Sequence, residues 1–465
     1  MSGVAAPSDL AFLTIAEARA LLRKRAVSSV ELTEAALGAL AALHERTNVV
    51  AELTVDLARK QARVADRRLR ASEPPPLCGI PYGAKDLLAT KDIPTRWGAP
   101  PYRDQVFDHD ATVIERLREA GAVLVGKLAM LSLAGAGGYR FASASLGGAT
   151  RNPWSASHWA GGSSSGSSAT VSAGVLPFAI GSETGGSIII PASFCGISGL
   201  RPSYGAVSRY GAMPVAWSCD KLGPLARSAA DCEAVFDAIA GPDPRDATTA
   251  DRTYRPSRRA PVRVGVLPFD FSGYPETERV FSDALRALRS EGLITRRVKL
   301  PRDDIRTIYR AISAAETSAA QGDLASSGAL EDLVDEGQRS GLRAAFSAPA
   351  AAYARAAEER IAAVRDVRAL FRDVDVLVAP TTVTEATRLE DDLDEWRPLP
   401  HYGALGALVG LPGLSVPMGF GRSGLPLGLH IIGDLFADKL VLRAGALFQR
   451  ATDWHLRRPP LPTSG

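Results

Sequence analysis

The chain has 465 residues, of which 46% are apolar and 23% are charged, and its net charge is +3. These values are ordinary for a soluble globular protein with a large core. Lysine and arginine are scattered rather than clustered, so we expect no nucleic-acid partner and no binding to an acidic membrane surface.

The sequence also predicts a cytoplasmic protein without metal or cofactor. No stretch reaches about 18 uninterrupted apolar residues, so no membrane span is expected. The first residues lack a basic segment followed by a continuous apolar one, so no signal peptide is expected. The cysteines have no CxxC spacing and indicate neither a metal site nor a disulfide framework; they are Cys78, Cys195, Cys219 and Cys232.

The N-terminal segment, residues 1–72, is predicted to be helical. Thr14 to Glu17 has the spacing of a capping box, which indicates that a helix begins there. Ser29 to Arg46 is amphipathic, and Thr54 to Arg70 forms a third predicted helix with a basic outer face. We expect these three helices to precede the first strand.

Lys85 lies between a glycine turn and an apolar run, in GIPYGAKDLLAT. Most lysines are solvated, and a surface position is one interpretation. The surrounding Pro-Tyr-Gly-Ala is not typical of a solvated face, so burial is the other interpretation.

An α/β alternation follows. Thr112 to Gly121 predicts a helix, AVLVG a strand and KLAMLSLA another helix. Gly121 to Lys127 formally matches a phosphate-binding loop. We reject that interpretation because its middle residues form a strand and no Ser or Thr follows the lysine.

Two glycine-serine turns stand at the centre of the sequence, between Trp159 and Arg201. The first contains Ser163 and the second contains Ser187. The segment AGVLPFAIG between them is predicted to be a buried strand. A flexible Gly/Ser linker is the plain alternative, but the long apolar stretches beside the turns would be costly to expose. Backbone N–H groups beside a serine are what an oxyanion hole requires, so the turns indicate a serine hydrolase-like site.

The rest of the chain continues the alternation. A helix is predicted from Ser228, and the polar, proline-rich residues 242–260 are expected to form an exposed connection. Residues 302–370 are predicted to form several helices. The other predicted elements are the strands VRVGVLP, TRRVKLP, DVDVLVAP, GLPGLSVPMGF and LPLGLHIIGD, and the helices TERVFSDALRALRSEG and Ala437 to Thr452.

The motifs GAKD, GGSSSGS and ETGGSIIIPASFCGISGLRP, in this order and spacing, resemble the amidase signature family. The resemblance implies an α/β fold, with one α/β/α domain over residues 1–465 built on a large mixed sheet flanked by helices. Within it, residues 79–240 correspond to the signature core. Residues 261–465 correspond to the C-terminal half, in which 302–370 is a variable helical insert.

By the same resemblance, the catalytic residues are Ser187, Ser163 and Lys85, a serine–cis-serine–lysine triad. Ser187 is a poor nucleophile until a base takes its proton, and Ser163 can pass that proton to a neutral Lys85. A lysine is neutral near pH 7 only if burial lowers its pKa from about 10.4. The cis peptide would precede Ser163.

The resemblance also implies that the oxyanion donors are backbone N–H groups and that nearby side chains contact the substrate. The expected donors are those of Thr184, Gly185, Gly186 and Ser187. The expected substrate-binding residues are Met130, Trp159, Gly162 and Phe194.

The expected reaction is hydrolysis of a C–N acyl bond through an acyl-enzyme. Several positions depart from the common family pattern: Glu183, Ile189, Ala129, Ser132 and His158. Because most of these changes remove charge, we expect a pocket for neutral hydrophobic or aryl amides, with aryl carbamates (urethanase activity) and esters as further substrates. We expect a monomer or homodimer that acts on a small amide or carbamate.

Three other functions are considered. The A-type subunit of a tRNA-dependent amidotransferase hydrolyses glutamine; against it, Pro400 stands near an expected Asp and RR-x-x-LG is absent. In an α/β-hydrolase, Ser164 would be the nucleophile and His430 or His455 the base, but no HGGG turn is present. A binding protein that kept only the fold is disfavoured because all three triad positions are filled.

Overall fold

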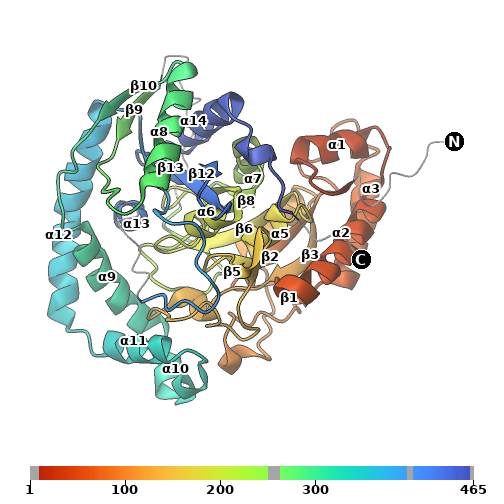
Figure 1. The fold of residues 1–465 in the computed structure, drawn as a ribbon. Coiled ribbons are helices and arrows are strands. Elements are labelled where there is room, and N and C mark those ends of the chain that lie inside the picture. Colours follow the sequence, from red (N-terminus) through yellow and green to blue (C-terminus); the bar gives the residue numbers. More distant parts are fainter. Residues whose placement is uncertain (1–9, 250–261, 395–401, 461–465) are drawn as a thin grey trace.

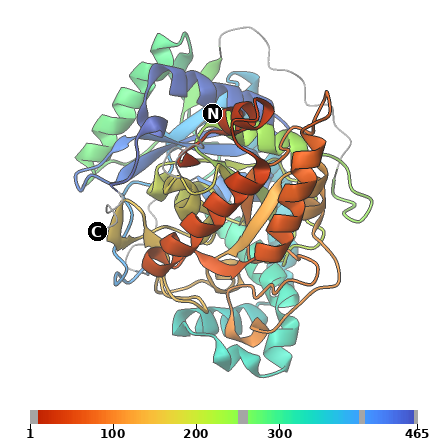
Figure 2. The same cartoon turned by 90° about the vertical axis from the view of Figure 1, so that its right-hand side faces the viewer.

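The computed structural model describes residues 10–249, 262–394 and 402–460. An eleven-stranded sheet runs through the middle of the molecule, and helices surround it (Figure 1). The N-terminal helices α1–α3 and the helices α9–α12 lie on opposite sides in this view. After a 90° turn, α2 and α3 lie side by side at the front (Figure 2).

The elements have the following bounds. The strands are β1 Val50–Leu53, β2 Pro81–Lys85, β3 Val123–Leu128, β4 Arg151–Asn152, β5 Ser155–Trp159, β6 Phe178–Glu183, β7 Ser198–Arg201, β8 Lys221–Ala226, β9 Arg263–Val266, β10 Ile294–Arg297, β11 Val376–Pro380, β12 Gly413–Phe420 and β13 Pro426–Gly433. The helices are α1 Ile15–Arg23, α2 Ser29–Thr47, α3 Val55–Arg68, α4 Thr112–Glu119, α5 Ser165–Ser172, α6 Ile189–Cys195, α7 Ala229–Ile239, α8 Pro275–Ser290, α9 Ile305–Ala320, α10 Gly322–Ser326, α11 Glu336–Phe346, α12 Ala350–Ala369, α13 Gly403–Val409 and α14 Asp438–Ala451. Short 3₁₀ turns are η2 Pro100–Tyr102, η3 Ser132–Gly135, η4 Ala329–Asp332, η5 Leu370–Arg372 and η6 Trp454–Leu456.

The sheet is mixed, as predicted. Its strand order is β1-β3-β2-β6-β8-β7-β12-β13-β11-β9-β10, and β4 and β5 form a separate hairpin. The pairs β2–β3, β2–β6, β9–β11 and β9–β10 are parallel, and the other pairs in this sheet are antiparallel. One sheet therefore takes strands from both the signature core and the C-terminal half. That residues 1–465 form a single domain stays a prediction.

The core has two main layers, one on each face of the sheet. On β6, Phe178 and Ile180 belong to a cluster that includes side chains of α7 and α14. Ala179, between them, belongs to a second cluster that includes side chains of α5 and α6. Successive side chains of a strand point to opposite faces, so this alternation places β6 between two layers of helices.

Some predicted elements are confirmed and others are wrong. Helix α1 begins after Thr14, whose hydroxyl oxygen accepts from the Glu17 N–H while its own backbone N–H donates to the Glu17 carboxylate, which completes the capping box. Helix α2 matches the predicted amphipathic helix, but the short strand β1 lies between α2 and α3, so the three helices do not precede the first strand. The helix predicted over KLAMLSLA is instead the end of β3 and the turn η3.

Helix α5 and strand β8 were not predicted. All eight residues of α5 are buried, and they include five serine or threonine residues, so no amphipathic pattern marks the helix. Two of its hydroxyls bond back to carbonyls of the same helix: Ser168 Oγ donates to the Ser165 carbonyl and Thr170 Oγ1 to the Gly166 carbonyl, both at 2.9 Å. The strand predicted over AGVLPFAIG begins later than expected and runs further, as β6 from Phe178 to Glu183. Part of the connection expected over 242–260 lies outside the described residues.

Candidate active site

Lys85 is the last residue of β2 and is fully buried. Its Nζ donates hydrogen bonds to Ser163 Oγ at 2.7 Å and to Ser182 Oγ at 2.9 Å. β2 lies between β3 and β6, which accounts for the burial and for the contact with Ser182 on β6. The structure thus places Lys85 against two hydroxyl groups rather than a carboxylate.

Burial lowers the pKa of Lys85. Removal from water lowers the pKa of its ammonium well below the usual value, while the negative charges of Glu183 and Asp220 act in the opposite direction. A lysine with a lowered pKa can be neutral near pH 7 and accept a proton.

Ser163 lies between β5 and α5, and the Gly162–Ser163 peptide bond is cis. The Leu131 N–H donates to the Ser163 carbonyl at 3.2 Å. The Ser164 N–H donates to the carbonyl of Ser187 at 3.3 Å, so this contact joins the two glycine-serine turns.

The second turn is held from the end of β6 by Glu183. Its Oε2 accepts from the N–H groups of Ile188 at 2.8 Å and Ile189 at 3.0 Å. Its Oε1 accepts from Arg201 Nη1 at 2.7 Å, and both charged side chains are fully buried. Glu183 therefore fixes the chain immediately after Ser187.

Thr184 holds the turn from its other end. Its hydroxyl donates to Asp220 Oδ1 at 2.6 Å. Within the described part of the chain, the N–H groups of Gly185, Gly186 and Ser187 donate no hydrogen bond. N–H groups left open beside a serine are available to a developing oxyanion.

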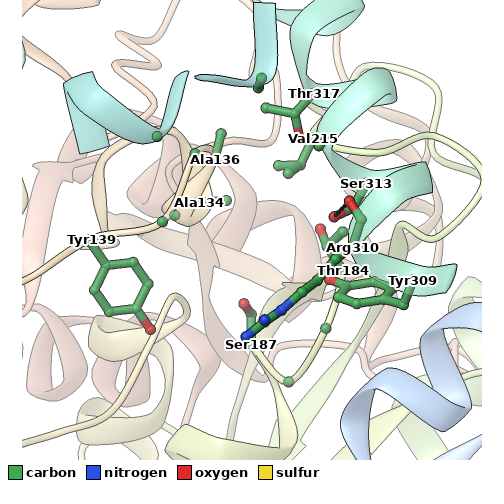
Figure 3. Close-up of a pocket in the computed structure, with 18 of the residues that line it drawn as sticks. Ala134, Ala136, Tyr139, Thr184, Ser187, Val215, Tyr309, Arg310, Ser313 and Thr317 are labelled. Carbon is green, nitrogen blue, oxygen red and sulfur yellow. Dashed lines mark hydrogen bonds between the residues drawn. The ribbon is translucent and has the colours of Figure 1, made fainter. Parts of the chain in front are cut away.

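Ser187 lines a cavity of about 850 Å³ (Figure 3). The turn Thr184–Ser187 and Gly162 form part of its wall, and residues 134–139 form another part. Helix α9 contributes Arg306, Tyr309, Arg310, Ser313, Ala314 and Thr317. Residues from the signature core and from the variable insert thus share one cavity.

Only one of the four residues predicted to bind the substrate lines the cavity. Gly162 lines the cavity, whereas Met130, Trp159 and Phe194 are buried and are not among its lining residues. Trp159 packs edge-on against Phe194 and against Tyr139, with a ring-centroid distance of 5.9 Å to Tyr139, which does line the cavity. The substrate-binding roles of these four residues stay predictions.

The expectation of a cavity with few charges is wrong. Arg306, Arg310 and Asp394 all line it. The substitutions that led to that expectation, at Ala129, Ser132 and Ile189, are not among the lining residues, so they do not report the cavity's charge.

The sequence did hold a signal for the charged wall. Arg306, Arg310, Ser313 and Thr317 are spaced by four, three and four residues, which places them on one face of a helix. This face was overlooked because the residues fall outside the family motifs.

Tyr309 of α9 also lies close to the turn Thr184–Ser187. A Cβ built on Gly185 would lie 2.2 Å from the Tyr309 hydroxyl oxygen, so only glycine fits there without movement of Tyr309. The glycine at this position therefore permits close packing of α9 against the turn.

The α/β-hydrolase alternative finds no support in the geometry. Ser164 is fully buried, and its hydroxyl donates to the Ser182 carbonyl at 3.2 Å. His430 is buried in β13, and neither His430 nor His455 lines the cavity.

Two further features concern the described residues as a whole. No helix there has the length and apolar character needed to cross a bilayer. In the same ranges, no group of three or more His, Cys, Asp or Glu side chains is placed to hold a metal ion.

Comparison with known proteins decides the family. The model of the family described as Amidase matches residues 31–442. The chain belongs to the amidase signature family. Enzymes of this family cleave C–N bonds, so the resemblance seen in the motifs is confirmed, as is the α/β fold.

Amidase signature relatives align over nearly the whole chain. The A-type subunit of glutamyl-tRNA(Gln) amidotransferase from Roseiflexus sp. (strain RS-1) is 38% identical, with 97% of this chain and 98% of the relative covered. Its counterpart in Methylococcus capsulatus, which has the same name, is 37% identical, with 96% and 98% covered. Among solved structures, native peptide amidase from Stenotrophomonas maltophilia has a TM-score of 0.85 and 32% identity, covering 97% of this chain and 99% of that one.

Proposed function

We propose that the protein hydrolyses the C–N bond of a small amide through an acyl-enzyme on Ser187. The 2.7 Å contact between Lys85 and Ser163 carries the proposal. It places a buried amine next to a hydroxyl on the turn that is joined to the turn of Ser187. A buried amine with no carboxylate bonded to it is suited to act as a base.

The proposed reaction uses two proton transfers. Lys85 takes the proton of Ser163, Ser163 takes that of Ser187, and Ser187 Oγ bonds to the carbonyl carbon. The N–H groups of Thr184, Gly185, Gly186 and Ser187 stabilise the negative oxygen. The proton then returns through Ser163 to the substrate nitrogen, the C–N bond breaks, and ammonia or an amine leaves. Water hydrolyses the ester by the same relay.

Glutamine is the best-supported substrate. Relatives of up to 38% identity are named as A-type subunits of glutamyl-tRNA(Gln) amidotransferase, and the cavity carries two arginines. A charged cavity suits an amino acid better than a neutral aryl group. The chain lacks RR-x-x-LG in residues 302–370, and Pro400 lies outside the described residues.

Neutral aryl amides and aryl carbamates are a second candidate. The observation that favours them is the apolar part of the cavity wall. This part combines the small residues of 134–138 with Ile190, Val215 and Leu393. Burial of an aryl group against such a wall contributes about 25 cal/mol per Å².

The names of the relatives also suggest a partner for this chain. These relatives are named as one subunit of an amidotransferase, so a different protein subunit is a candidate partner, in place of the monomer or homodimer expected above. Co-purification of the tagged protein from its own host, followed by size-exclusion chromatography with light scattering, distinguishes these states.

One enzyme preparation tests the proposed function. We expect ammonia release from glutamine, with kcat/KM compared against 4-nitroacetanilide and a nitrophenyl carbamate. Faster turnover of the aryl substrates would favour the second candidate, and no turnover of any of them would contradict the proposal for these substrates.

The nucleophile is tested separately. A phosphonate probe should modify Ser187, read by mass spectrometry of the digested protein, and Ser187→Ala should abolish both adduct and turnover. Ser157→Ala, at an exposed serine of β5, is the matched control and should leave both unchanged. An adduct on Ser164 would overturn the assignment.

A further inference from the structure

Helix α9 presents one polar face to the cavity. Arg306, Arg310, Ser313 and Thr317 follow each other at helical spacing, and all four line the cavity. In Figure 3 the Arg310 side chain extends from α9 across the cavity toward Ser187. Its guanidinium therefore faces the space in which the substrate would lie.

Arg310 lines the cavity without a carboxylate partner among the described residues. Within the described ranges, no Asp or Glu oxygen lies within 4.0 Å of its guanidinium, and the side chain makes no hydrogen bond. By contrast, Arg302, just before α9, pairs with Asp304 and with Asp366. Arg310 is therefore a cation without a counter-ion inside a cavity that also holds Ser187.

Three of the described side chains that line the cavity are charged, and they are Arg306, Arg310 and Asp394. Burial lowers the pKa of the Arg306 guanidinium, and the charge of Arg310 lowers it further. Like charges four residues apart on a helix destabilise it, and a bound anion would relieve their repulsion.

We propose that Arg310 binds a carboxylate of the substrate, which makes the protein selective for small amides that also carry a free carboxylate. This inference rests on the proposed function of Ser187. A guanidinium offers a planar pair of N–H donors that matches the two oxygens of a carboxylate. The substrate class is the ω-monoamides of short dicarboxylic acids, with or without an α-amino group, and glutamine is one member.

Paired substrates separate this role from catalysis. Glutaramate and hexanamide are both primary amides on short chains and both release ammonia, but only glutaramate carries a carboxylate. We expect Arg310→Met to lower kcat/KM for glutaramate roughly 10- to 100-fold and to leave hexanamide within about twofold. The loss should appear as a higher KM with kcat nearly unchanged, because the contact is present before and during the reaction.

Two further variants control for charge. Arg310→Lys keeps the positive charge but not the planar pair of N–H donors. Its kcat/KM for glutaramate should therefore fall less than that of Arg310→Met. Arg355→Met removes an exposed arginine of α12 that does not line the cavity, and it should leave both substrates unchanged. Equal losses for glutaramate and hexanamide in Arg310→Met, or an equal loss in Arg355→Met, would overturn the proposal.

A binding measurement keeps the test independent of turnover. Ser187→Ala should bind glutaramate in calorimetry, and Ser187→Ala/Arg310→Met should bind it roughly 10- to 100-fold more weakly. If the wild-type protein hydrolyses neither amide, the proposed function fails for them, and these two dissociation constants still decide the role of Arg310. Equal constants would refute it.

Discussion

Replacing Lys85 should remove activity and, at the same time, stabilise the fold when the substitute is apolar. The side chain is fully buried, and among the residues that the structure describes its Nζ bonds to the hydroxyls of Ser163 and Ser182 and to no carboxylate. Burial lowers the pKa of Lys85 well below the ordinary value. The neutral amine that we propose as the base therefore comes at a cost in stability.

The loss of activity follows from the loss of the base. General-base catalysis contributes about 10²–10⁴-fold, so Lys85→Ala should lower kcat/KM by at least that factor. In the wild-type protein, kcat/KM should rise with pH through the pKa of Lys85 in the free enzyme, because only the neutral amine accepts a proton. This rising limb should be absent from whatever activity Lys85→Ala retains.

The stability effect has a definite sign. An unfolded lysine, with a pKa of about 10.4, is protonated at neutral pH, whereas the folded protein disfavours the ammonium. Folding stability therefore falls as pH decreases from the unfolded pKa to the folded pKa, and it stays low below the folded pKa. Each tenfold reduction in proton affinity corresponds to about 1.4 kcal/mol.

Urea unfolding of the wild-type protein and Lys85→Met measures this effect. The methionine variant fills similar space without a charge, and it should be more stable at about pH 6 than the wild type, with a smaller advantage at about pH 9. An activity of Lys85→Ala near that of the wild type across neutral and alkaline pH would refute the role as base. A stability difference that does not change with pH would refute the lowered pKa.

Two other predictions concern the turn of Ser187. Glu183→Gln should destabilise the protein by about 3–5 kcal/mol in urea unfolding, because it leaves the buried Arg201 without a counter-charge. Glu183→Gln/Arg201→Met should regain part of that loss, and a double variant as unstable as the single one would contradict this explanation. Gly185→Ala should lower kcat/KM because its Cβ would meet the Tyr309 hydroxyl, and Gly185→Ala/Tyr309→Phe should restore part of the rate. No recovery in the double variant would show that the alanine acts on the turn itself.

The sequence predicted the parts of the fold that have a clear pattern. The capping box at Thr14 marked the start of α1, and apolar runs marked strands such as β11 and β13. Helix α5 has no such pattern, since its small hydroxyl side chains are buried on all sides. Strand β1 has only four residues, all partly exposed, which is too short to show alternation.

The candidate site was likewise predicted only in part from the sequence. Motifs located Lys85, Ser163 and Ser187, and the structure brings their segments together through the Lys85–Ser163 and Ser164–Ser187 contacts. The family resemblance implied the cis peptide before Ser163, but no pattern in the residues themselves indicates it, and none indicates that Trp159 packs against Tyr139. Both depend on packing between segments that are distant along the chain.

The proposed substrate contacts come from a different part of the chain than the proposed chemistry. Lys85, Ser163 and Ser187 belong to the sheet and its turns, whereas Arg310 belongs to α9 in the variable insert. A change on α9 can therefore alter which amide binds while the proton relay stays intact. This separation explains why substitutions within the motifs gave a wrong expectation for the cavity's charge. It also implies that substrate preference in related chains should be inferred from the residues aligned with the cavity face of α9, rather than from the glycine-serine motifs.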